Sequence, residues 1–276
     1  MQVDSHHHFW KYEAAEYGWI SPEMSVLKRD FLPTYLLEEI RGTGIDGVIS
    51  VQARQTEEET NWLLAMAAEH EFIRGVVGWV PLASKDIRSV LEPLAQSSWL
   101  KGVRHVVQDE PDDGFILNAD FNRGISELGR FGLIYDILIY AKHLANSIRF
   151  VDQHPAQSFV VDHIAKPTIR SDEFHQTWAD EMRELARREH VVCKFSGVVT
   201  EVRDASWSTD SIRPYWEVAL EAFGPNRLMF GSDWPVCLLR SEYSKWVSTV
   251  RELISELSPT EQAEIMGATA CRTYEL

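Results

Sequence analysis

Three consecutive histidines, His6, His7 and His8, follow Asp4 and a serine near the start of the sequence. We interpret this stretch as a short strand, in which successive side chains point to opposite faces. Asp4, His6 and His8 are therefore expected on one face, with His7 on the other. Two imidazoles at this spacing can converge on one metal ion or one polar substrate group. The run is shorter than a usual histidine tag and continues into an aromatic pair, which favours a functional role.

Other residues able to do chemistry stand at or just after the ends of further apolar runs. Ionisable groups in buried positions are costly unless they are paired or put to use. Their repeated occurrence at these places indicates one shared site. The residues are Gln52, Trp79, Arg104, Asp136, His163, Lys166, Lys194, Asp233 and Trp234.

The histidines and Asp233 are compatible with two mechanisms. In the first, His6, His8 and His163 bind one divalent metal ion, such as zinc, and Asp233 completes the site. The ion would polarise a carbonyl and lower the pKa of a bound water. In the second mechanism no metal is present, and the imidazoles with Arg104 stabilise an oxyanion. In both, Asp233 is the general base that takes a proton from water and passes it to the leaving oxygen.

The remaining residues of this set are candidates for binding the substrate. Aromatic faces can stack on a substrate ring, and charged or amide side chains can bind its polar groups. We assign this role to Gln52, Trp79, Arg104, Asp136, Lys166, Lys194 and Trp234. Arg104 and His105 alternate along a strand, so only one of them can face inward, and Arg104 is favoured. Asp162 adjoins His163 and is expected on the opposite face, in a structural role.

Eight short apolar segments alternate with helical segments through the chain. This pattern predicts an α/β fold, a (β/α)₈ TIM barrel in which residues 1–276 form a single domain. The expected strands lie within residues 1–10, 46–52, 73–82, 100–107, 133–140, 159–163, 191–198 and 227–234. A doubly wound open sheet is the alternative, but the glycine-rich phosphate fingerprint that usually follows its first strand is absent. In a barrel, catalytic residues gather at the carboxyl ends of the strands, where the candidate residues stand.

Residues 11–33 form a long irregular segment that is rich in aromatic side chains. Loops of this length are usually functional, as lids or pocket walls. Two interpretations have equal weight: the segment borders the site, or its aromatic side chains only cap the barrel.

The composition restricts the partners of the protein. The formal net charge is −15, which argues against nucleic acid or an anionic membrane as a partner. The three cysteines, Cys193, Cys237 and Cys271, are widely spaced and favour a reduced, cytoplasmic setting. No signal peptide and no membrane span are expected. A small-molecule substrate is expected, and a homo-oligomer is compatible with the sequence.

Several motifs, taken together and in order, resemble the amidohydrolase superfamily, in particular its lactonase-rich amidohydrolase 2 branch. They are Asp4-x-His6-x-His8-Phe9-Trp10, Lys101-Gly102-Val103-Arg104, Asp162-His163-Ile164-Ala165-Lys166-Pro167, Lys194-Phe195-Ser196-Gly197 and Gly231-Ser232-Asp233-Trp234-Pro235. Within that branch, the stretch from Arg104 to Pro111 and the run from Leu228 to Leu238 resemble L-fuconolactonases. The resemblance covers essentially the whole chain.

The resemblance implies a (β/α)₈ barrel that hydrolyses a sugar lactone, such as L-fucono- or L-rhamnono-lactone, to its acid. It also implies that Asp233 is the general base and that His6, His8 and His163 surround the carbonyl. The chain lacks the bridging ligand and the strand-five histidine of two-metal members, so one metal ion or none is expected. The alternative is a metal-dependent decarboxylase or amide hydrolase on the same barrel. The terminal family motif Asn-Ala-x-Arg-x-Tyr is present here with Thr269 in place of asparagine.

Overall fold

Eight parallel strands form the centre of the computed structural model, which describes residues 1–276. The strands follow one another around the sheet in chain order, which confirms the predicted TIM-barrel-like fold. Two backbone hydrogen bonds of 2.7 Å, His8 N–H to Trp234 O and Asp233 N–H to His6 O, join the last strand to the first and nearly close the barrel. The strands are β1 Val3–His7, β2 Gly47–Val51, β3 Ile73–Gly78, β4 Leu100–His105, β5 Ile134–Ile137, β6 Phe159–Val161, β7 Val191–Phe195 and β8 Leu228–Phe230.

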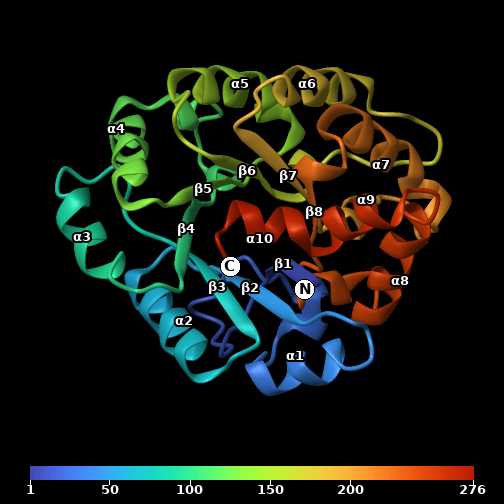
Figure 1. Cartoon of the computed structure of the whole chain (residues 1–276), viewed down its shortest axis with the longest axis horizontal. Helices are drawn as coiled ribbons and strands as arrows, with labels where there is room; N and C mark the ends of the chain where they lie inside the picture. Colours follow the sequence, from blue (N-terminus) through green and yellow to red (C-terminus); the bar gives the residue numbers. More distant parts are fainter.

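Helices surround the strands as an outer ring (Figure 1). α4 illustrates why they form: Asn118 caps its first turn by accepting hydrogen bonds from two backbone N–H groups, and Phe121, Ile125 and Leu128 form its buried face. The helices are α1 Pro33–Ile40, α2 Glu57–Glu69, α3 Ile87–Leu94, α4 Ala119–Leu128, α5 Leu144–Gln153, α6 Gln176–Ala186, α7 Thr209–Phe223, α8 Tyr243–Leu253, α9 Pro259–Ala263 and α10 Thr269–Thr273. None of them is long and apolar enough to cross a membrane.

Apolar side chains cover both faces of the sheet. One large cluster packs between the strands and the helices, and a smaller one, which includes Val51, Val77 and Met229, fills the barrel itself. Strands that are buried on both faces need apolar residues at nearly every position. This explains the near-continuous apolar runs of the sequence.

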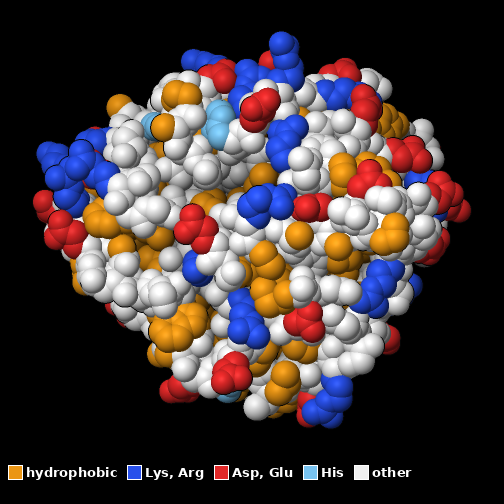
Figure 2. Space-filling view, in the orientation of Figure 1, with side chains coloured by type: hydrophobic (Ala, Val, Ile, Leu, Met, Phe, Trp, Pro, Cys, Tyr) orange, Lys and Arg blue, Asp and Glu red, His pale blue; other side chains and the backbone are white.

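The end of the chain closes the amino-terminal end of the barrel. α10 lies across this opening in Figure 1, and Ala270 and Tyr274 belong to the apolar cluster inside the barrel. Figure 2 shows the same face in space-filling form, with positive and negative side chains interspersed among apolar ones. The carboxyl ends of the strands lie at the other end of the barrel, which remains free to form a site.

Strand β1 does not alternate regularly. Its pairing with β2 changes register between Asp4 and His7, and the Asp4 carboxylate accepts a hydrogen bond of 3.1 Å from the Tyr243 hydroxyl on α8. Asp4 therefore faces the helix layer. The prediction that it shares one face with His6 and His8 is wrong, because the register shift breaks the two-residue period.

Candidate functional site

A cavity of about 520 Å³ opens at the carboxyl ends of the strands. His8, Arg104, His163 and Asp233 line it, so residues at the carboxyl ends of four different strands reach the same space. This is the position at which active sites occur in (β/α)₈ barrels.

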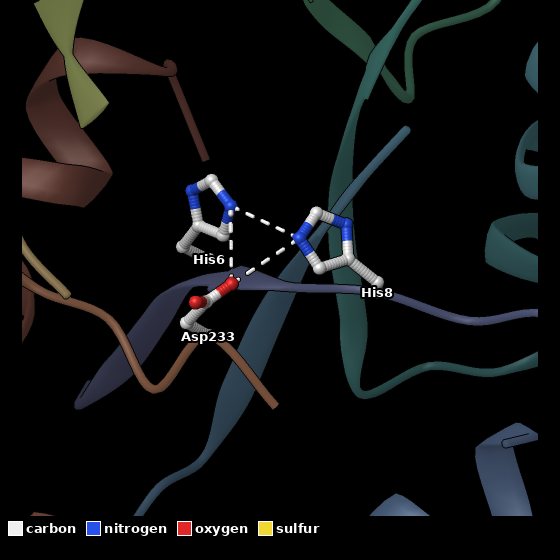
Figure 3. A group of neighbouring side chains, drawn as sticks. All are labelled: His6, His8 and Asp233. Carbon is white, nitrogen blue, oxygen red and sulfur yellow. Dashed lines mark hydrogen bonds and ion pairs between the residues drawn. The ribbon is translucent and has the colours of Figure 1, made fainter. Parts of the chain in front are cut away.

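His6, His8 and Asp233 form the centre of the site. Figure 3 shows the two imidazoles and the carboxylate pointing toward one another. The Nε2 atoms of the histidines lie 3.3 Å apart, and Asp233 Oδ1 lies 3.3 Å from His8 Nε2 and 3.8 Å from His6 Nε2. All three side chains are buried. Three potential ligands thus converge on one small volume.

Hydrogen bonds orient the imidazoles. His8 Nδ1 lies 2.8 Å from the carbonyl oxygen of Val51 and donates to it, which leaves the Nε2 lone pair facing Asp233 and the cavity. His163 joins the group at a ring-centroid distance of 4.4 Å from His6, and its Nδ1 atom lies 2.9 Å from Ser196 Oγ. The imidazoles are therefore fixed from outside the cavity.

The backbone that carries two of these residues is strained. His163, Ile164, Ala165 and Lys166 all have positive φ angles between 47° and 57°, and Asp233 has φ 58°. Non-glycine residues rarely adopt this left-handed conformation, and such strain is concentrated at functional sites. Contacts with the rest of the fold hold this turn in place. One of them is a buried hydrogen bond of 2.7 Å, which the Trp178 indole donates to the Ile164 carbonyl oxygen.

A network of buried charges lies beside His6. Asp162 contacts His6 Nδ1 at 3.3 Å, the Arg104 guanidinium at 2.9 Å and the Lys194 ammonium at 3.1 Å. The prediction that Asp162 faces away from the site is therefore wrong. β6 ends at Val161, and the left-handed turn that follows brings Asp162 and His163 to the same side. In the sequence, only the motif around His163 pointed to a place for Asp162 in the site.

Asp136 and Lys194 are separated from the cavity by this network. The Lys194 ammonium lies 2.5 Å from Asp136 Oδ2, and both side chains are fully buried. The Tyr274 hydroxyl, from the end of the chain, donates to Asp136 at 2.9 Å. Neither residue lines the cavity, so the structure does not place them among groups that contact a substrate directly. Their connection to the site is through His6 and Asp162.

The charge states follow from burial and neighbours. Burial alone would raise the pKa of Asp233, but His163 and His8 lower it below its usual value, so the side chain is a carboxylate at neutral pH. Burial lowers the pKa of His163 to about 4 and that of His6 well below its usual value, so both rings are neutral. Neutral imidazoles beside an ionised carboxylate suit both metal binding and proton transfer.

Arg104 faces the cavity and His105 faces outward, as favoured from the sequence. The Arg104 Nη2 atom donates to the Gln52 carbonyl oxygen at 2.5 Å and to Gln52 Oε1 at 3.0 Å. His105 instead accepts from the Trp79 indole at 3.2 Å and pairs with Glu110 at 2.6 Å. Trp79 is therefore turned toward the outward-facing His105 and does not line the cavity.

Trp234 also lies away from the cavity. It is 1% exposed and packs edge-on against Phe31 and Phe9, with ring centroids 5.1 Å and 6.3 Å away. Its neighbour Asp233 points into the cavity, and the two side chains diverge after the end of β8. Of the predicted substrate-binding residues, Gln52, Arg104 and Lys166 line the cavity, whereas Trp79, Trp234, Asp136 and Lys194 do not.

The long segment before α1 borders the site, which decides between the two interpretations of it. Glu16 and Trp19 line the cavity, and Trp19 is 39% exposed. The sequence pattern indicated this segment as a candidate wall but pointed to neither residue in particular. Arg54 and Gln108, on the connections after β2 and β4, also line the cavity and were not predicted. Gln108 falls within the Arg104–Pro111 stretch that carries the resemblance, whereas Arg54 carries no local motif.

The central group fits one divalent metal ion. Four tetrahedral ligands about 2.0–2.1 Å from an ion lie about 3.3–3.4 Å from one another. The separations among His6 Nε2, His8 Nε2 and Asp233 Oδ1 are 3.3, 3.3 and 3.8 Å, and the donors are of the type that zinc prefers. Arg104 Nη1 lies 3.2 Å from His6 Nε2, so an ion would replace this one contact.

Comparison with known proteins gives a consistent result. The sequence model of a family described as Amidohydrolase matches residues 3–276. The chain is 41% identical over 293 residues to the L-fucono-1,5-lactonase of Burkholderia multivorans, covering 100% of this chain and 96% of that protein. It is 32% identical to the L-fucono-1,5-lactonase of Burkholderia ambifaria, with the same coverage. A crystal structure of an amidohydrolase from Burkholderia multivorans with bound zinc is 40% identical, with a TM-score of 0.95 over 100% of this chain and 99% of that one.

Proposed function

Because this chain belongs to the amidohydrolase family, we propose that it hydrolyses a sugar lactone to the corresponding aldonic acid. L-Fucono-1,5-lactone is the favoured substrate, since two full-length relatives are named as lactonases of this compound. The observation that carries the proposal is the buried carboxylate of Asp233, which lies at the cavity beside His8 and the neutral ring of His6. An ionised base next to a polar cavity is what ester hydrolysis by water requires.

In this mechanism, Asp233 acts first as a general base. It takes a proton from a water molecule as the water oxygen forms a bond to the lactone carbonyl carbon. The carbonyl oxygen becomes an oxyanion, and the ammonium of Lys166 and the guanidinium of Arg104 are the cationic groups at the cavity that can stabilise it. When the ring C–O bond breaks, Asp233 returns the proton to the leaving oxygen, which gives a hydroxy acid. The neutral His163 orients the reacting groups.

Free hydrogen-bonding groups at the cavity support a polyhydroxylated substrate. The Gln52 amide nitrogen is buried and has no partner, whereas its oxygen is held by Arg104. Lys166 also lines the cavity, and its ammonium lies over the Tyr140 ring at 5.6 Å. Trp19 offers an aromatic face at the cavity. In this proposal these groups bind sugar hydroxyls and the ring, and Trp19 replaces Trp79 and Trp234 as the stacking residue.

One divalent ion, with zinc favoured, is bound by His6, His8 and Asp233 in this proposal. Such an ion polarises the lactone carbonyl and lowers the pKa of water when bound. The cluster of His6, Asp162 and His163 also has ligand spacing, but Arg104 and Lys194 already neutralise Asp162. A second ion is not part of the proposal.

The metal site predicts that the protein binds about one zinc ion and that His8→Ala weakens this binding at least about 100-fold. Loss of a partner behind a ligand costs about 10–100-fold in metal affinity, and loss of a ligand costs more. Zinc titration by calorimetry with elemental analysis measures both quantities. His70→Ala, at the residue that follows α2 and away from the site, is the control and should bind zinc like the wild type. Unchanged affinity in His8→Ala would place the ion elsewhere.

The proposed activity is tested with a pH-indicator assay over L- and D-aldonolactones of both ring sizes. We expect turnover of L-fucono-1,5-lactone or a close stereoisomer far above the rate in buffer. Assays before and after chelation show whether the ion is required for turnover. Release of CO₂ from a carboxylate substrate or cleavage of an amide, with no lactone hydrolysed, would support the decarboxylase or amidase alternative instead.

A further inference from the structure

Glu59 is a buried carboxylate that the proposed reaction does not use. It lies in the first turn of α2, and its side chain is 1% exposed, whereas its neighbours Glu57 and Glu58 are exposed. The side chain does not line the cavity. A buried acidic side chain needs partners to compensate for lost hydration. Its partners therefore show what it is for.

Those partners are backbone groups of the cavity wall. Glu59 Oε2 accepts hydrogen bonds from the N–H groups of Ala53 and Arg54, at 2.9 and 2.7 Å. Both residues line the cavity. The helix does not need this carboxylate, because the Thr56 side chain already caps α2 by accepting from Glu59 N–H at 3.1 Å. In a capping box the glutamate would return to the N-cap residue, but here it extends past it to the loop.

Arg54 links the segment that Glu59 holds to a second part of the cavity wall. Its guanidinium forms an ion pair with Glu16 and lies over the Tyr17 ring at 5.4 Å, so it joins the loop after β2 to the segment before α1. The Arg54 Nε atom lies 3.8 Å from Glu59 Oε1, an oxygen without a hydrogen-bond partner. The Arg54 segment is therefore held between two glutamates: Glu59, which does not line the cavity, and Glu16, which does.

Burial raises the pKa of Glu59 to about 7, although the N–H groups of Arg54 and Ala53 lower it. Keeping a carboxylate in this place therefore costs stability. Perturbed, buried groups of this kind are concentrated at functional sites.

We propose that Glu59 is a positioning residue that fixes the Ala53–Arg54 segment, so that Arg54 and Glu16 complete the wall of the substrate cavity. This inference rests on the proposed lactone hydrolysis at the same cavity. Glu59 acts through the loop and touches no reacting atom. It therefore governs substrate binding, and Asp233 and the histidines keep their geometry without it.

The test compares Glu59→Ala and Glu59→Gln with the control Glu58→Ala, an exposed glutamate in the same turn. We expect Glu59→Ala to raise KM for the lactone about tenfold, with kcat within about threefold, because uniform substrate binding is lost. Glu59→Gln should restore most of the affinity, since its amide oxygen can accept both N–H groups. Glu58→Ala should match the wild type. A fall in kcat at unchanged KM in Glu59→Ala would overturn the proposal, as would equal loss in the alanine and glutamine variants.

Hydrogen exchange of residues 52–56, followed by mass spectrometry, provides a readout that does not depend on turnover. Exchange in this segment should be faster in Glu59→Ala than in the wild type and unchanged in Glu58→Ala and Glu59→Gln. Equal protection in Glu59→Ala and the wild type would contradict the positioning role. If the wild type hydrolyses no lactone but the segment still loosens in Glu59→Ala, the proposed substrate is wrong and the positioning role stands.

Discussion

Replacement of Asp233 by asparagine is expected to lower kcat for lactone hydrolysis by about 100- to 10,000-fold, the usual contribution of a general base. The amide has the same shape as the carboxylate but cannot accept the proton of the attacking water. The side chain is buried and fixed by His8, so a water molecule cannot easily take its place. Steady-state kinetics with the best lactone of the panel measures the loss.

Asp109→Asn is the matched control for this experiment. Asp109 also lines the cavity but contacts none of the histidines, so its replacement should change kcat by less than about tenfold. A similar loss in both variants would indicate a general effect of cavity charge. Nearly full activity in Asp233→Asn would transfer the role of base to another group, of which His8, with its Nε2 atom 3.3 Å from Asp233 Oδ1, is the nearest candidate.

Replacement of Gly197 by alanine is expected to lower kcat/KM by at least about 100-fold, since displacements of about 1 Å in a catalytic group have effects of this size. A Cβ atom at Gly197 would lie 2.6 Å from His163 Nδ1 and 2.9 Å from Asp233 Oδ2. Both side chains are held from other sides, His163 by Ser196 and Asp233 by His8, so neither can retreat without moving the site. Kinetics together with thermal unfolding separates the loss of activity from the loss of stability.

Gly132→Ala provides a control with the same backbone strain. Gly132 has φ +66°, close to the +63° of Gly197, but a Cβ atom there would meet nothing within 4 Å. Gly132→Ala should lose about 1–2 kcal/mol of stability, because alanine is disfavoured in the left-handed region, and Gly197→Ala should lose at least as much, because its Cβ also meets the site. Only Gly197→Ala should lose activity. Equal activity in the two variants would mean that His163 and Asp233 tolerate displacement and that the site is less rigid than its packing indicates.

Much of the barrel could be predicted from local patterns. A parallel strand that is buried on both faces must be apolar along its length, and the helices between strands carry one apolar face. Both signals are contained in short stretches, so eight strands could be located one by one. Once the barrel was inferred, its geometry indicated that His6, His8, His163 and Asp233 meet at one end.

Side-chain direction beyond a strand end could not be predicted in the same way. Alternation holds only while the backbone stays extended. Val160 lies inside the barrel, so Asp162 also points inward, and the left-handed turn that begins at His163 brings that residue to the same side. The register shift in β1 turned Asp4 away from the site for a related reason. These departures depend on contacts with distant segments, such as the Trp178 indole and the Tyr243 hydroxyl.

The sequence by itself determined the barrel and the chemical character of the site, because hydrophobic period and residue type are local properties. The tertiary structure alone decided which polar residues reach the cavity. Lys194 and Asp136 are paired with each other outside it, whereas Arg54 and Trp19 reach it from loops whose sequence did not indicate these two positions. The position of each of these side chains depends on its interactions with groups far apart in the chain, because a buried charge is stable only beside an opposite charge. No spacing along the sequence encodes that distance.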